Sequence, residues 1–237
     1  MSSKQLSLFD HLEEIRTRLI VTLAYFVIVF FVSIIWVKDL YLFIVKDLPM
    51  KLTVLGPSDV IWAYFMISGV IAITLTLPLI FYQIWAFVKP GLYEREQKLV
   101  RIYIPSMFFL FLSGFAFGYF IILPIILKFL MSLSEGMFNE MYTIHKYFTF
   151  VFGIALPFAC LFLLPLLIMF LTTLGIINPK LLSKYRKYAY FILIVVATVI
   201  SPPDFISDFI VAVPLILIYE ISIICSKFVF HKNKQEQ

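Results

Sequence analysis

The chain has 237 residues, of which 62% are hydrophobic and only 14% are charged, and its mean hydropathy is +1.02. This composition excludes a soluble globular domain and indicates an all-α integral membrane protein that crosses the bilayer several times. The net charge of +5 does not indicate a nucleic-acid partner, because the basic residues fall in short clusters between apolar runs. We expect residues 1–237 to form a single transmembrane domain embedded in lipid.

A charged stretch with helical periodicity, residues 10–19, precedes the first apolar run. Leu12, Ile15 and Leu19 recur at a spacing that places them on one helix face. No helix breaker separates this stretch from the apolar run that follows. We therefore expect its carboxylates to be held rigidly at the membrane surface.

Two interpretations of these carboxylates remain open. Glu13 and Arg16 are three residues apart, and Glu14 and Arg18 are four apart, so the charges can pair within their own helix. In that case the stretch is an ordinary start of a membrane helix. Alternatively, the carboxylates bind a cationic partner at the surface.

Six apolar runs follow one another along the chain, each long enough or nearly long enough to cross the hydrocarbon core, which takes about 20 helical residues. Their approximate limits are 19–37, 60–87, 100–127, 148–177, 188–200 and 205–225. The second span is expected to kink at Pro78, and the fourth is expected to break at Pro157 and Pro165.

Two shorter features modify this plan. Residues 40–45 are apolar but too short to span, so we predict an interfacial helix or a partly buried cap there. In the third span, Gly114 and Gly118 form a small-xxx-small pattern, which predicts close approach of another helix.

The last two spans are predicted to form a short hairpin. The turn between them is Ser201-Pro202-Pro203-Asp204. A helix of about 15 residues rises only ~22 Å against a core of ~30 Å, so this hairpin should not reach the far surface. Glu220 is embedded near the end of the sixth span, where two roles remain open, that of a snorkelling or hydrogen-bonded end residue and that of a functional residue.

The basic residues set the orientation. Of the 19 Lys and Arg, 14 lie in the N-terminal tail, the 88–101 loop, the 180–187 loop and the C-terminal tail. An even number of spans puts these four segments on one side. Both termini are therefore predicted to be cytoplasmic, or on the equivalent side of an organelle membrane.

Enzymes that work inside membranes are excluded by the residues they need. The three histidines fall in predicted loops or tails, and Asp204 and Asp208 share one turn instead of facing each other from two spans. No phosphate-binding loop, zinc spacing or nucleophile elbow occurs. Cys160 and Cys225 lie in apolar runs, which favours buried thiols. We expect no catalysis, no cofactor and no metal.

A peptide receptor fits the remaining features best. The carboxylates predicted at the cytoplasmic surface are Glu13, Glu14, Glu94 and Glu96, and carboxylates on rigid helix ends suit bidentate recognition of guanidinium groups. The alternative is a secondary transporter or channel. Such proteins usually have internal repeats and several intramembrane charges, whereas no inverted repeat is detectable here and Glu220 is the one carboxylate clearly within a span.

Several strings, taken in order with the six spans, resemble the TatC family, the polytopic receptor subunit of the twin-arginine protein translocase. They are residues 11–19, residues 78–87 with Pro90-Gly91-Leu92-Tyr93 and Glu96, Phe117-Gly118-Tyr119-Phe120 with Pro124, Ser201-Pro202-Pro203-Asp204, and residues 214–222. The resemblance covers nearly the whole chain and implies a glove-like, concave bundle.

The resemblance also implies a function and a site. TatC-like proteins recognise folded precursors through consecutive arginines in the signal peptide, and the matching positions here are Glu14 and Glu96. Arg16 matches a position that helps to order the N-terminal surface. Glu94, beside Glu96, and Glu13, beside Glu14, are neighbouring candidates. Export by this family is driven by the proton-motive force.

The family further implies partners and a location. TatA/TatB-type single-span proteins dock along the fifth and sixth helices, where Thr198, Ser201 and Asp208 are the polar positions. Self-association in a receptor complex and residence in the bacterial cytoplasmic (inner) membrane, or an equivalent organellar membrane, are implied as well. We assign structural roles to five residues: Pro78, Pro202, Pro203, Asp204 and Glu220.

One departure from the family concerns the fourth span. TatC proteins commonly carry a glutamate there, in a Phe-Glu-x-Pro string, whereas this chain reads Phe162-Leu163-Leu164-Pro165. No other acid in that span replaces it. A role for a deep carboxylate therefore does not carry over to this chain.

Overall fold

The computed structural model describes residues 8–46, 48, 52–88, 94–134 and 141–235, and these are almost entirely helical. The helices are α1 (Leu8–Ser33), η1 (Ile34–Trp36), α2 (Val37–Val45), α3 (Pro57–Val88), α4 (Glu94–Phe117), η3 (Gly118–Ile122), α5 (Leu123–Ser134), α6 (Ile144–Leu161), α7 (Leu164–Thr173), α8 (Pro179–Lys184), α9 (Arg186–Ile200) and α10 (Phe205–Gln235). Within the described residues, one isolated β-bridge joins Thr53 to Thr143.

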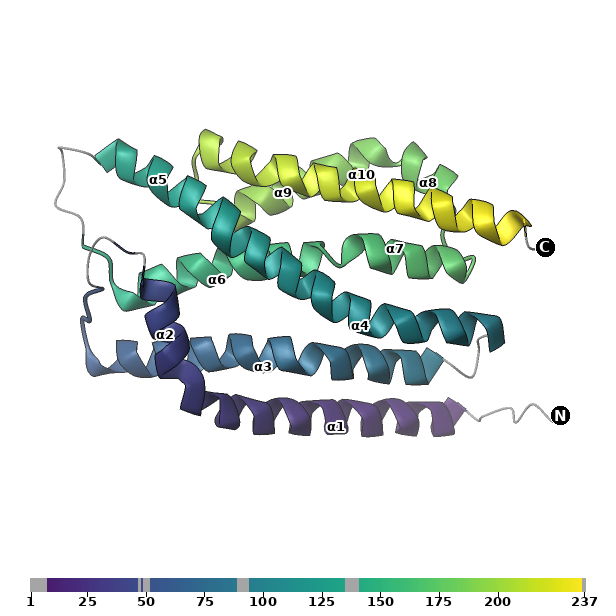
Figure 1. Ribbon diagram of the computed structural model, residues 1–237, viewed down its shortest axis with the longest axis horizontal. Helices are drawn as coiled ribbons and strands as arrows, with labels where there is room; N and C mark the ends of the chain where they lie inside the picture. Colours follow the sequence, from purple (N-terminus) through teal and green to yellow (C-terminus); the bar gives the residue numbers. More distant parts are fainter. Residues whose placement is uncertain (1–7, 47, 49–51, 89–93, 135–140, 236–237) are drawn as a thin grey trace.

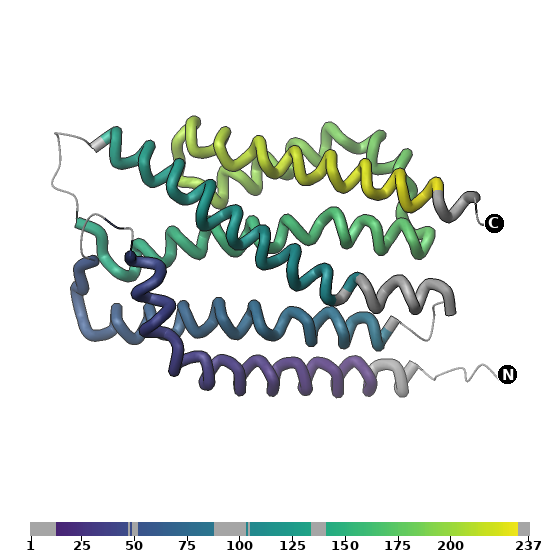
Figure 2. Tube along the Cα trace, in the orientation of Figure 1, coloured from purple at the N-terminus to yellow at the C-terminus, as the bar shows by residue number. Residues whose placement is uncertain are grey.

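The long helices run side by side and alternate in direction, so both termini lie at the same end of the bundle (Figure 1). The helix α1 packs along α3, α4 along α6, and α10 along both α7 and α9. The trace in Figure 2 runs from the N-terminal pair α1 and α3, through the oblique α4 and α5, to the C-terminal pair α9 and α10. Which side of a membrane the termini occupy stays a prediction.

Five stretches of the described helices are long and apolar enough to cross a membrane. They are Glu13–Val45, Pro57–Phe87, Pro105–Leu133, Ile144–Thr173 and Phe205–His231. The remaining predicted span corresponds to α9, which has only 15 residues. The chain is thus a multi-pass helical membrane protein, and the count of six spans and the single-domain division stay predictions.

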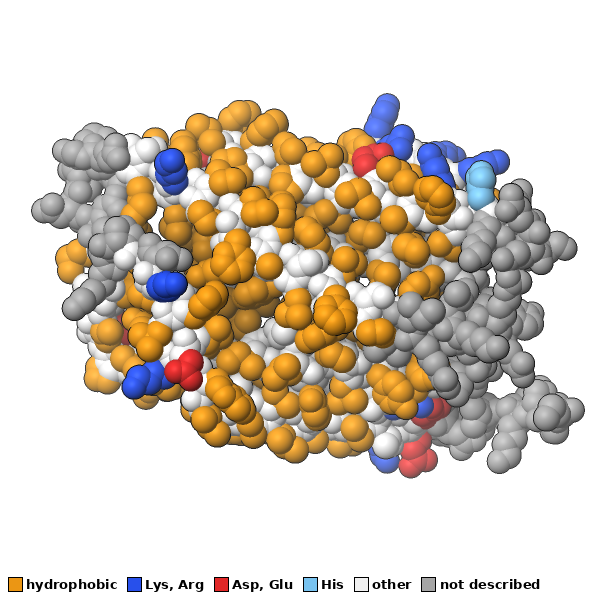
Figure 3. Space-filling model, viewed as in Figure 1, with side chains coloured by type: hydrophobic (Ala, Val, Ile, Leu, Met, Phe, Trp, Pro, Cys, Tyr) orange, Lys and Arg blue, Asp and Glu red, His pale blue; other side chains and the backbone are white. Residues whose placement is uncertain are grey.

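Apolar side chains cover the middle of the molecular surface and charged ones gather towards its two ends (Figure 3). On α1, for example, Leu19 is 67% exposed and Phe31 62% exposed. The packed core centres on α6, whose Phe148, Phe152 and Phe158 are almost fully buried. The exposed apolar band is what a lipid environment requires of a helical bundle.

The close approach predicted at Gly114 and Gly118 is confirmed, and its partner is α6. A Cβ atom on Gly114 would lie 2.7 Å from Cβ of Phe162 and 2.8 Å from the carbonyl oxygen of Phe158. A Cβ on Gly118 would lie 3.0 Å from Cα of Ala155. Gly118 also begins the π-helical turn η3, which inserts a wide turn into the third span.

The predicted break in the fourth span is half wrong. The helix α6 continues through Pro157 and ends at Leu161, and the chain breaks at residues 162–163. Pro165 has no N–H to donate to the carbonyl of Leu161, and it lies in the first turn of α7, where that N–H is not needed. In the second span, α3 runs through Pro78 as one assigned helix.

Two predicted spans continue as helix past their predicted limits, and where each span ends in a membrane stays a prediction. The third continues through α5 to Ser134, past Lys128, because a lysine near a helix end can extend its amine to the surface. The sixth continues to Gln235 in a helix of 31 residues. Both cysteines are free thiols, but Cys160 is exposed, so the prediction that it is buried is wrong.

The helix α2 confirms the predicted cap over residues 40–45. Its Val37 and Ile44 are buried, and Tyr41 stacks on Phe148 of α6 with ring centroids 5.8 Å apart. Tyr119 of η3 donates a hydrogen bond to the carbonyl oxygen of Ile44, 3.2 Å away. The cap therefore closes the end of the bundle opposite the termini.

At the other side of the bundle, α9 and α10 form the predicted hairpin. Its turn stops short of the end reached by α5 and by the start of α3 (Figure 1). The amide of Asp204 donates to the carbonyl oxygen of Pro202 at 2.7 Å, and Oδ1 of Asp204 accepts from the amide of Ser207 at 2.7 Å. Asp204 thereby caps the start of α10.

Candidate functional site

The first turns of α1 carry three of the predicted site residues, Glu13, Glu14 and Arg16, together with Arg18. Helical geometry divides these four side chains between two faces. Glu14 and Arg18 lie one turn apart on the face toward α3, where their side chains are 29% and 25% exposed. Glu13 and Arg16 point outward, and each side chain is 70% exposed. The continuous helix fixes this division, since no breaker lies between the charged stretch and the span.

Both predicted ion pairs form, but they differ in distance and in exposure to solvent. Arg16 Nη2 lies 3.4 Å from Oε1 of Glu13, in an exposed pair that solvent screens. Arg18 donates to Oε1 of Glu14 twice, from Nη2 at 2.6 Å and from Nε at 3.0 Å. The second pair is therefore a tight, charge-assisted contact in a partly buried place.

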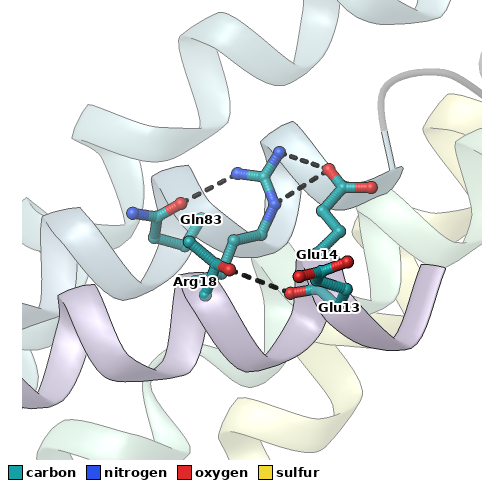
Figure 4. Close-up of polar contacts among 5 residues, drawn as sticks. Glu13, Glu14, Arg18 and Gln83 are labelled. Carbon is teal, nitrogen blue, oxygen red and sulfur yellow. Dashed lines mark hydrogen bonds and ion pairs between the residues drawn. The ribbon is translucent and has the colours of Figure 1, made fainter. Parts of the chain in front are cut away.

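Arg18 also connects two helices. Its Nη1 donates to Oε1 of Gln83 on α3, 2.8 Å away, so the guanidinium bridges Glu14 and Gln83 (Figure 4). Gln83 lay within a string used for the family resemblance, but no role was assigned to it. The signal available in the sequence was an uncharged polar residue near the end of a long apolar span.

These side chains line an open cavity of about 460 Å³ at the end of the bundle where α1 begins. Its lining consists of Glu13, Glu14, Thr17, Arg18, Val21 and Gln83. Thr17 is tied to its own helix, since its hydroxyl donates to the carbonyl oxygen of Glu13 at 2.9 Å. A carboxylate at the mouth of such a cavity is suited to bind a cationic group that arrives from solvent.

The other two predicted carboxylates, Glu94 and Glu96, belong to the first turn of α4. Their side chains fall outside the described part of the molecule. Their distance from Glu14 and their role at the site therefore stay predictions.

The embedded Glu220 belongs to a separate cluster between α9 and α10. Arg186 donates from Nη2 to Oε2 of Glu220 at 2.7 Å, and Tyr190 donates from its hydroxyl to Oε1 at 2.5 Å. Nearby, the hydroxyl of Tyr219 donates to the carbonyl oxygen of Leu182 at 3.0 Å. Paired in this way, the carboxylate joins α9 to α10, and its predicted structural role stays a prediction.

Three residues predicted to contact partner helices meet at the hairpin turn. The carboxylate of Asp208 accepts hydrogen bonds from the hydroxyls of Ser201 and, at 3.4 Å, Thr198. Thr198 is exposed, whereas Ser201 is buried. These bonds fix the turn within the chain, and contact with a partner stays a prediction.

Leu163, the position that departs from the family, is the residue directly before α7, and its side chain makes no capping hydrogen bond. A buried polar contact between helices does occur further along α7, where the hydroxyls of Thr172 and of Ser226 on α10 are 2.7 Å apart. Among the described residues, no three His, Cys, Asp or Glu side chains gather as a metal site would require.

The family model described as Sec-independent protein translocase protein (TatC) matches residues 10–214. The chain belongs to the TatC family. It is 48% identical over 237 residues to Sec-independent protein translocase protein TatCd of Bacillus subtilis strain 168. The aligned region covers 100% of this chain and 98% of that protein. It is also 39% identical to TatCy of the same strain, over 99% of this chain and 94% of the relative.

A solved structure agrees with this assignment. The crystal structure of the twin arginine translocase receptor TatC superposes with a TM-score of 0.81 at 30% sequence identity, and covers 92% of this chain and 99% of that one. The family inferred from the sequence strings is thus confirmed, together with the helical membrane fold. TatC proteins are named as protein translocase components, which removes the support for a small-molecule transporter or channel.

Proposed function

We propose that this chain is the signal-peptide receptor and core subunit of a twin-arginine translocation complex, which exports folded proteins across the membrane using the proton-motive force. Its membership of the TatC family supports the proposal. The observation that carries it is the contact of Glu14 with a guanidinium group at the open cavity. The proposal involves no cofactor and no catalytic step.

The Glu14 contact indicates why arginine is the ligand. The guanidinium of Arg18 places two N–H donors on one carboxylate oxygen, at 2.6 and 3.0 Å. A lysine ammonium is a compact point charge without this planar fork, so it cannot reproduce both bonds in the same geometry. A site with this carboxylate should therefore prefer arginine to lysine.

A pair of arginines needs a second carboxylate. We assign that role to Glu96 at the start of α4, where the neighbouring Glu94 could share it. On the outer face of α1, we propose Glu13 as a further contact for the peptide and Arg16 as a residue that helps to order this surface. The support for Glu96 is its match to the family position and its place in the first turn of α4, and the support for Glu94 is its place beside Glu96 in that turn.

The α9–α10 hairpin is the proposed contact for membrane partners. Its turn region exposes large apolar side chains, among them Val199 at 81%, Phe205 at 85% and Phe209 at 64%. We propose that TatA/TatB-type single-span helices and the hydrophobic part of the signal peptide pack there, near Thr198, Ser201 and Asp208. Self-association and the bacterial cytoplasmic membrane, or an equivalent organellar membrane, complete the proposal.

The test is binding of the full-length protein in lipid nanodiscs to a twin-arginine signal peptide and to the same peptide with two lysines. We expect the arginine peptide to bind about tenfold more tightly, which corresponds to ~1.4 kcal/mol. Glu14→Ala and Glu96→Ala should each remove that difference. Asp39→Ala, an acidic residue exposed on α2 at the other end of the bundle, should preserve it. Equal binding of the two peptides to the wild type would refute the proposal.

A further inference from the structure

We propose that Arg18 is a resident occupant of the Glu14 carboxylate, and that an arginine of the signal peptide binds by replacing it. The inference rests on the proposed function and concerns the regulation of the same site. In this proposal, Arg18 is an internal competitor that lowers the affinity of Glu14 for every ligand.

The geometry is that of a ligand already bound. The guanidinium of Arg18 takes Oε1 of Glu14 through two N–H groups, which is the kind of contact proposed for an incoming arginine. Arg18 and Glu14 both line the cavity that the incoming group must enter. A second guanidinium cannot make the same two bonds to Oε1 while Arg18 holds them.

Local charge leads to the same conclusion. The four charged side chains described on the first turns of α1, Glu13, Glu14, Arg16 and Arg18, sum to zero. With Arg18 bound to Glu14, these first turns of α1 offer no net negative charge to a doubly positive ligand. Freeing the Glu14 carboxylate restores the attraction at the point of contact.

Gln83 makes the exchange feasible. A partly buried guanidinium that lost its only acceptor would carry a desolvation penalty. Arg18 avoids this because its Nη1 bond to Oε1 of Gln83, 2.8 Å long, does not involve Glu14. The guanidinium of Arg18 can thus stay bound to Gln83 of α3 while the Glu14 carboxylate turns to the new arginine, as the arrangement in Figure 4 allows.

The measured affinities distinguish a residue that competes for Glu14 from a residue that positions Glu14. A competitor that every ligand must displace raises all dissociation constants by one common factor and leaves their ratio unchanged. A residue that positions Glu14 would instead improve the binding of arginine specifically, so removing it would abolish the preference for arginine over lysine.

The experiment measures the affinities of the twin-arginine and twin-lysine peptides for full-length wild type, Arg18→Gln and Arg18→Lys in nanodiscs. For Arg18→Gln we expect both dissociation constants to fall by the same factor, about 3- to 10-fold given the usual strength of such a pair. Arg18→Lys should give a smaller fall. Lys187→Gln, which removes one positive charge from an exposed position on α9, should change neither constant by this factor.

A direct readout accompanies the affinities. The Nε–H resonance of Arg18, assigned by its absence from Arg18→Lys in arginine-labelled protein, should shift when unlabelled twin-arginine peptide saturates the site. A resonance that does not move on saturation would overturn the exchange, even if a substituted protein folded poorly.

The two proposals fail in different ways. If the wild type prefers arginine in a Glu14-dependent manner, but Arg18→Gln weakens or does not alter binding, Arg18 is not a competitor and the proposed function stands. If the wild type shows no preference, or Glu14→Ala does not affect it, the receptor site itself is misplaced and the inference falls with it.

Discussion

Arg186 at the start of α9 places Nη2 2.7 Å from Oε2 of Glu220 on α10, although 34 residues separate the two in the sequence. The pair lies beside the loop that leads from α8 into the hairpin. Because Tyr190 donates to the other oxygen of the same carboxylate, the two helices are fastened by charge as well as by packing.

Replacing Glu220 by alanine should therefore destabilise the hairpin. Arg186 and Tyr190 would both lose their acceptor, at a cost of about 1–3 kcal/mol, with the lower part of that range expected since the side chain of Arg186 is 40% exposed. Thermal unfolding in detergent would measure the loss. Glu220→Gln keeps an acceptor for Tyr190 and should lose less, and an alanine variant as stable as the wild type would contradict this assignment.

Gly114 of α4 and Gly153 of α6 provide a matched pair of positions for substitution by alanine. Gly114→Ala adds a Cβ 2.7–2.8 Å from Phe162 and the backbone of Phe158, so α4 and α6 must separate, at a cost of about 1–3 kcal/mol. At Gly153 an added Cβ meets nothing within 4 Å, and Gly153→Ala should be neutral or slightly stabilising. Unfolding midpoints of the two variants test the contrast, which equal midpoints would disprove.

The hydrogen bond between Thr172 and Ser226 joins α7 to α10 in a buried place. Thr172→Val and Ser226→Ala should each destabilise the protein, and the double variant should lose less than the sum of the two. A double-mutant cycle should give a coupling of about 0.6–1.7 kcal/mol, the usual range for such bonds in membranes. Strict additivity would mean that the hydroxyls do not interact.

Gly175 ends the α7 segment with a positive φ of 71°, while its amide donates to the carbonyl oxygen of Thr172 at 3.0 Å. Gly175→Ala should cost about 1 kcal/mol, because a Cβ disfavours this left-handed conformation. The cost is purely conformational, as an added Cβ would meet nothing within 4 Å. An alanine variant with unchanged stability would show that the turn relaxes.

Local rules explain which parts of the site the sequence could predict. The pairs Glu13–Arg16 and Glu14–Arg18 follow from spacing within one helix, and both form. The bond from Arg18 to Gln83 links residues 65 apart and depends on how α1 packs along α3. No pattern in a single sequence encodes that choice of neighbour.

For the fold too, local sequence patterns predicted some features, whereas others depend on tertiary packing. Apolar run lengths located the helices, and the glycine pattern in the third span identified a close contact without naming α6 as the partner. The proline rule failed at Pro157 and succeeded at Pro165, since a proline can be accommodated inside a membrane helix when its surroundings satisfy the backbone. Those surroundings are tertiary, so sequence spacing alone does not distinguish the two prolines.

The short hairpin gives the molecule unequal cross-sections in the two leaflets of a bilayer. The helix α10 packs on α7, α8 and α9, whereas the turn at residues 201–204 stops before the end formed by α2, α5 and the start of α6 (Figure 1). In a bilayer, lipid would have to fill the space beyond the turn or the bilayer would have to thin there. Several copies side by side should then impose curvature on the membrane that contains them.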